Sequence, residues 1–107
     1  MEKSENQEFR RLELVAVAKA MLAGHIHLIE GVRRICDLRF AVDAHEHEVF
    51  LPFRGIESET DTFPLGDMRA NCSAEYLQRM DDELRTYLSD AQADIYQACE
   101  EVVRTFS

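Results

Sequence analysis

Three acidic residues, Glu57, Glu59 and Asp61, stand at alternate positions in the stretch FRGIESETDTFP, residues 53–64. Carboxylates grouped in this way can bind a metal ion, exchange protons with a substrate, or pair with Lys and Arg of another protein. Alternate residues of an extended segment lie on one side of it. The pattern therefore predicts an acidic loop whose three carboxylates point the same way.

The acidic stretch has two interpretations. Ser and Thr alternate with the acids, so the stretch can be a solvated loop that caps backbone N–H groups and is anchored to the core by flanking aromatic residues. Alternatively it is a recognition loop, in which preset carboxylates pair with a basic partner and a Phe supplies a buried anchor in the interface. The candidate partner-binding residues are Phe53, Glu57, Glu59, Asp61, Phe63 and Asp67.

The four histidines form two His-x-His pairs, at 25/27 and 45/47, and neutral imidazole is a good zinc ligand. The predicted helix between the pairs is about 18 Å long and so holds them apart. We therefore expect helix-end and loop histidines and no metal. A metal-dependent enzyme that uses His45, His47 and the acids at 57–61 is the weakest alternative, because no GxSxG, HExxH, phosphate-binding or EF-hand motif occurs. The sequence predicts neither an enzyme nor a cofactor.

Composition narrows the class of partner. The chain has 107 residues, enough for one domain with its own core, and a formal net charge of −9. Such a surface repels nucleic acids and anionic membranes and attracts a basic protein. The three cysteines have no pairing or CxxC spacing, and the first residues lack the pattern of a signal peptide, so we expect reduced, mostly buried thiols and a cytoplasmic location.

Hydrophobic spacing predicts an all-α fold, a single helical domain over residues 1–107 with 1–7 disordered. Two N-terminal helices are expected over 8–23, ended by Gly24, and 28–39, where Gly31 allows close packing. An irregular capping insert follows, with a short helix at 44–51 that begins at a capping box from Asp43 and is bent by Pro52.

The last predicted helix begins after Ser73 and is long or broken. Its apolar stripe continues to Phe106, a length of about 50 Å, which exceeds the ~34 Å diameter of a compact domain of this size. The helix must therefore bend or break near Ser89–Asp90, or project and pack against a second copy of the chain.

The segments AKAMLAGHIHLIEGVRRICDLRF and FLPFRGIESETDTFPLGDMR resemble a group of small, functionally uncharacterised bacterial proteins with an IEGxR helix and a GIxSETDxxPxG stretch. This likeness implies a fold and no activity. In size, charge and class the chain is also similar to bacterial immunity proteins that neutralise basic toxins. We therefore expect an acidic binding protein that occludes a basic partner, with a structural or regulatory homodimer through the C-terminal helix as the alternative.

Overall fold

The structure, a computed structural model, describes residues 3–44 and 46–107, and every regular element within those ranges is a helix. The all-α prediction is therefore confirmed for this part of the chain. The elements, in chain order, are α1 (Lys3–Leu22), α2 (Leu28–Ala41), the 3-10 helix η1 (Glu48–Phe50), α3 (Leu51–Thr60), the 3-10 helix η2 (Gly66–Asn71) and α4 (Ala74–Phe106).

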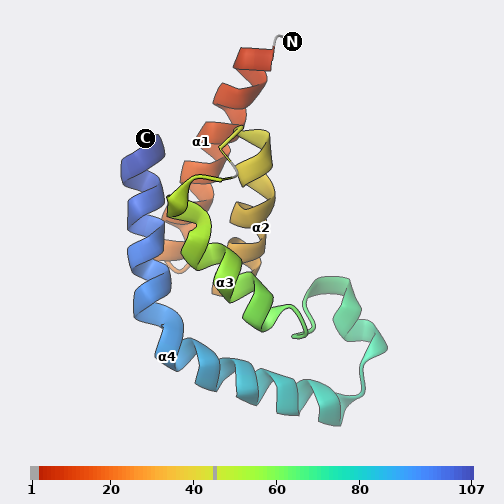
Figure 1. Cartoon of the computed structure of the whole chain (residues 1–107). Coiled ribbons are helices and arrows are strands. Elements are labelled where there is room, and N and C mark those ends of the chain that lie inside the picture. The colour runs from red at the N-terminus through yellow and green to blue at the C-terminus, as the bar shows by residue number, and fades with distance from the viewer. Residues whose placement is uncertain (1–2, 45) are drawn as a thin grey trace.

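The helices form a small bundle in which α1 packs against both α2 and the C-terminal half of α4 (Figure 1). Helix α3 lies across one side of this bundle, between α2 and α4. The core fills the space between these elements, and its largest fully buried side chains are Leu14, Met21, Ile29, Val32, Ile35, Phe50, Phe53, Ile95 and Val102. In the described ranges no helix combines the length and the apolar character needed to cross a bilayer.

Two glycines set the geometry of the α1–α2 pair as predicted. Gly24 follows the end of α1 with φ +76°, a left-handed conformation that glycine adopts at little cost. Gly31 lies against Met21, because a Cβ added at Gly31 would be 2.5 Å from both Cγ and Sδ of that side chain. Residues 1–7 were expected to be disordered; residues 3–7 instead form the first turns of α1, and residues 1–2 lie outside the described residues.

The segment between α2 and α3 differs from its predicted form. Asp43 does not begin a helix; it has φ +56° and follows the end of α2, with its N–H donating to the carbonyl of Phe40. Contrary to the prediction, Pro52 does not bend a preceding helix and instead lies in the first turn of α3. A proline is tolerated there because the N–H groups of a first turn have no partner within the helix.

Helix α4 is continuous over 33 residues and bends sharply about midway, so of the alternatives left open by the sequence the structure has the bend and not the break (Figure 1). Its N-cap is Ser73, as predicted, whose Oγ accepts a hydrogen bond from the N–H of Tyr76 at 3.1 Å. After the bend the helix buries Ile95, Ala98, Cys99 and Val102 in the core. The bend therefore keeps the apolar stripe against the bundle, although α4 contains neither Gly nor Pro.

The three cysteines are free thiols, and Cys36 and Cys99 are buried as predicted, while Cys72 is half-buried. Burial is the main cause that raises the pKa of both Cys36 and Cys99 to about 12. Both thiols therefore stay protonated and contribute as small apolar side chains.

Candidate functional site

The acidic stretch is helical and not an extended loop. Glu57 and Glu59 belong to α3, and Asp61 is the residue that caps its C-terminus. Residues two apart on a helix point to different sides. Glu57 is half-buried, and its carboxylate is among the causes that raise the pKa of Cys36 on α2, whereas Glu59 accepts a 2.6 Å hydrogen bond from the hydroxyl of Tyr87 on α4. The prediction that the three acids face one way is therefore wrong.

The predicted aromatic anchors also have different positions from those expected. Phe53 is fully buried in the core, as the first interpretation of the stretch expects, and is not accessible to a partner, so its predicted role as a partner-binding anchor is wrong. Phe63 is half-buried and packs against the core, while Asp61 and Asp67 are exposed and lie outside the pockets described below. The chain around Phe63 is fixed by Arg33, whose Nη2 donates to the carbonyls of Thr60 and Phe63 at 2.8 and 3.2 Å.

Helix α3 forms because its buried residues recur at helical spacing. Phe53, Ile56 and Thr60 lie three and four positions apart on the inner face, and the Thr60 hydroxyl donates to the carbonyl of Ile56 at 2.7 Å. That spacing continues the apolar face that begins at Val49 and Phe50. This helical spacing is visible in the sequence. The predicted helix stopped at residue 51, next to Pro52, and so left out the residues that follow Leu51 in α3.

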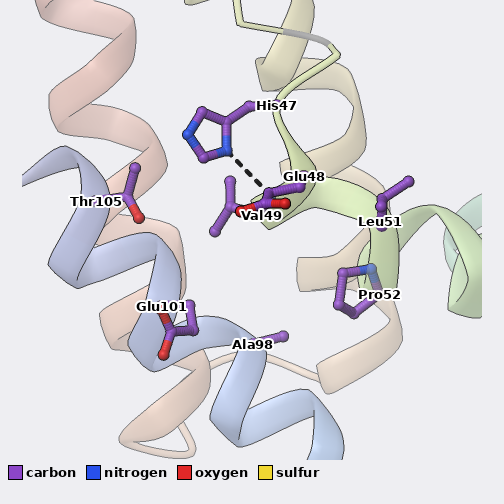
Figure 2. Close-up of a pocket in the computed structure, with 8 residues that line it drawn as sticks. All are labelled: His47, Glu48, Val49, Leu51, Pro52, Ala98, Glu101 and Thr105. Carbon is purple, nitrogen blue, oxygen red and sulfur yellow. Dashed lines mark hydrogen bonds between the residues drawn. The ribbon is translucent and has the colours of Figure 1, made fainter.

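A hollow surface lies between the η1–α3 segment and α4. One pocket of about 440 Å³ opens at the η1 end (Figure 2), and a second of about 490 Å³ opens between the C-terminal half of α3 and the bend of α4. A third pocket, of about 370 Å³, shares Pro52, Asp94 and other lining residues with these two. We call this continuous surface the α3–α4 groove; its lining residues are His47, Glu48, Val49, Leu51, Pro52, Gly55, Ile56, Glu59, Tyr87, Asp90, Ala91, Asp94, Gln97, Ala98, Glu101 and Thr105.

The α3–α4 groove is apolar at its floor and acidic at its rims. Its carboxylates are those of Glu48, Glu59, Asp90, Asp94 and Glu101, and among the residues that the structure describes no Lys or Arg lines it. Of these carboxylates, that of Glu101 forms an ion pair with Arg104 along α4, and Arg104 is itself exposed. A cationic ligand would therefore meet mostly unneutralised carboxylates.

Tyr87 closes one end of the groove through its hydrogen bond to Glu59. Burial, followed by the Glu59 carboxylate, raises the pKa of Tyr87 to about 12. The phenol is therefore neutral throughout the physiological range, and its O–H donates a hydrogen bond to Glu59. This contact links the C-terminal end of α3 to α4.

The histidines act at helix ends. The Nδ1 atom of His27 accepts a hydrogen bond from the N–H of Ile29 at 3.2 Å and caps α2, and Nδ1 of His47 accepts from the N–H of Val49 at 3.0 Å and caps η1. His25 is exposed and His45 lies outside the described residues. Within the described ranges, no three His, Cys, Asp or Glu side chains are grouped closely enough to hold a metal ion.

In comparisons with family models, with curated proteins and with solved structures, no match to this chain is found. The resemblances drawn from the sequence therefore remain predictions. Of the predicted site residues only Glu59 lies in the groove. The spacing of Asp90, Asp94, Gln97 and Glu101 along one predicted helix is the signal that could have located the remaining wall.

Proposed function

We propose that this chain is an acidic protein-binding module that neutralises a basic partner by covering the partner's cationic surface with the α3–α4 groove. The observation that carries this proposal is the groove itself, an apolar floor between two rims that hold five carboxylates and no Lys or Arg from the described residues. Apolar contact supplies affinity at the centre of an interface, and complementary charge steers the approach and selects the partner.

The mode of action that we propose is immunity-like, and the basic partner is of the type represented by a bacterial toxin. The net charge of −9 supports it, because a strongly acidic surface accelerates association with a basic protein. We place this binding in the cytoplasm. No covalent chemistry is needed, since occlusion of the partner's surface is sufficient to inhibit it.

The proposal is tested with the partner itself. Proteins retained by the immobilised full chain from a lysate of the producing cells at low salt, and released at high salt, are identified and purified. The dissociation constant and the association rate of the purified partner are then measured at several ionic strengths. We expect the association rate to fall as salt increases, because salt screens the attraction between exposed charges.

Two triple variants separate the groove from the overall charge. Glu59→Gln/Asp94→Asn/Glu101→Gln neutralises the groove, and Asp37→Asn/Glu83→Gln/Glu100→Gln removes the same charge from exposed positions outside it. We expect the groove variant to bind at least ~100-fold more weakly, because each close charge pair contributes ~1.5 kcal/mol or more and each 1.4 kcal/mol is about tenfold. The control should change the affinity less than about threefold. Equal weakening by both variants, or a retained partner with an acidic surface, contradicts the proposal.

A further inference from the structure

The two walls of the α3–α4 groove are faces of helices. The residues that α4 contributes recur at three- and four-residue spacing over more than four turns, from Tyr87 to Thr105. The residues of α3 follow the same pattern from Leu51 to Glu59. Side chains on such faces form ridges that pack between the ridges of a further helix, at an interaxial distance of about 8–10 Å from each wall helix.

The lining of the groove includes small side chains on both walls, which permit close approach. Ala91 and Ala98 lie on α4, Pro52 and Gly55 lie on α3, and a Cβ added at Gly55 would meet nothing within 4 Å. Leu51 is the large apolar residue beside them and is 57% exposed. Apolar side chains of an occupant would therefore find both space and a contact surface.

The acidic residues occupy both rims at matching separations. On α4, Asp90, Asp94 and Glu101 follow one another at intervals of four and seven residues, so the line from Asp90 to Glu101 is about 16 Å long. On the opposite wall, Glu48 and Glu59 are also eleven residues apart. Glu48 and Glu101 line the pocket at one end, and Glu59 and Asp90 line the pocket at the other. An occupant helix of three turns would span this distance, and Lys or Arg on both of its flanks would face the two acidic rims.

An extended segment is a poorer occupant than a helix. The described residues contain no strand, so they offer no sheet edge to which a partner strand could add. A strand placed in the groove would lose water from its backbone groups without gaining a ladder of hydrogen bonds, whereas a helix satisfies its backbone internally.

Resting on the proposed function, we propose that the occupant of the α3–α4 groove is an amphipathic α-helix of the partner protein. Its apolar stripe lies on Gly55, Ala91 and Ala98, and Lys or Arg on both sides of the stripe pair with the carboxylates of the two rims. The helix completes a bundle of which α3 and α4 provide two members.

The probe is a synthetic peptide of about 18 residues, acetylated and amidated, with Leu and Ala on one helical face and Lys and Arg on both flanks. Two controls carry the same composition, one scrambled to remove the amphipathic pattern and one with two central Pro residues. Binding to the full chain is measured by fluorescence anisotropy, and peptide helicity by circular dichroism. We expect the amphipathic peptide to gain helicity on binding and to bind at least tenfold more tightly than either control.

Variants locate the bound peptide. Gly55→Phe fills the groove without changing charge, and Ala16→Phe places the same side chain on the exposed surface of α1. A second pair is used if Gly55→Phe lowers the melting temperature. Asp94→Lys changes an exposed residue of the groove, and Glu83→Lys makes the same charge change at an exposed residue outside it. We expect at least tenfold weaker binding for each groove variant and less than twofold change for each control.

Equal affinity for the three peptides, no measurable binding, or an unchanged affinity of Gly55→Phe and Asp94→Lys overturns the helical occupant. The proposed function is judged separately, by the charge variants and the purified partner. A partner that depends on the groove carboxylates but occupies the groove with an extended segment leaves the proposed function in place and removes this inference alone.

Discussion

Gly31 and Gly55 both lie within helices, but they have opposite surroundings. Gly31 is buried, and a Cβ there would be 2.5 Å from two atoms of the fully buried Met21 side chain. Gly55 is exposed on α3, with open space beside it. The first glycine is required by packing, while the second leaves the groove open at the cost of helix stability.

We expect Gly55→Ala and Gly31→Ala to change the free energy of unfolding in opposite directions. Gly55→Ala should raise it by about 0.5–1 kcal/mol, because Ala restricts the unfolded chain and favours the helix. Gly31→Ala gains the same helix term, but the crowding of Met21 costs about 1–3 kcal/mol and should give a net loss. Urea denaturation of both variants measures the two values, and changes of the same sign would contradict the packing described here.

At the same scale, the sequence predicted individual residues well wherever a local rule applied. Gly24, Gly31, Ser73 and the helix-end histidine at 27 have the positions that their types and spacing indicated. Phe53 was wrongly assigned to partner binding because the acidic stretch that follows it was taken as a loop. The sequence alone does not distinguish an aromatic residue beside a loop from one in the core.

Between elements, η2 is held against α4 by one ion pair with two parallel hydrogen bonds. Both terminal nitrogens of Arg69 donate to the carboxylate of Asp81, each at 2.8 Å. The hydrogen bonds from Arg69 hold the pKa of Asp81 below its ordinary value, and burial opposes this effect. The pair joins the connection after α3 to the first half of α4, which contributes only Leu84 to the buried core.

This pair should make the stability depend on pH in a defined direction. Because the folded state lowers the pKa of Asp81, the contribution is present above the ordinary carboxyl value of about 3.9 and is lost as the pH falls through the folded-state pKa. We therefore expect Asp81→Asn to lower the melting temperature at neutral pH, and the difference from the wild type to shrink in acid. Asp82→Asn, which changes a neighbouring exposed carboxylate, is the control. A difference that is constant with pH would exclude this role for Asp81.

The sequence predicted the long helices, but it did not predict which residues of the insert between α2 and α4 are helical. Pro52 has two opposite meanings, a break inside a helix or a favourable residue in its first turn, and only the partners of η1 and α3 decide between them. The bend of α4 was predicted from its length, whereas its continuity depends on the packing of both halves.

For the whole molecule, the groove could not be predicted, because it joins residues 47–59 to residues 87–105 and local spacing carries no information about that pairing. The homodimer was predicted because the apolar stripe of α4 is longer than a compact domain can bury. The second half of the bent α4 packs into the core of its own chain, so that part of the stripe needs no second copy to cover it. The net charge of −9 is a property of the whole chain that the sequence states directly, and the basic partner predicted from it stays a prediction.

We therefore expect a monomer in solution at micromolar concentration. The chain mass is 12.4 kDa, and light scattering coupled to size-exclusion chromatography measures the mass directly. The measurement is made at low and high salt, because the charge of −9 opposes self-association most strongly at low salt. A mass near twice this value at both salt concentrations would favour the dimer through α4.

The packing of α1 against α4 has a consequence for synthesis of the chain on the ribosome. The Arg11 guanidinium donates to the carbonyl of Phe106, and Cys99 Sγ lies 3.7 Å from Met21 Sδ, so the two helices furthest apart in the chain close the core together. After α2 is complete, about 65 residues must still be translated, which at ~5–20 residues per second takes several seconds. During that time the face of α1 that packs against α4 in the folded chain is uncovered. Until α4 emerges, the nascent chain therefore has only the pairing of α1 with α2, and then of α2 with α3, to bury apolar surface.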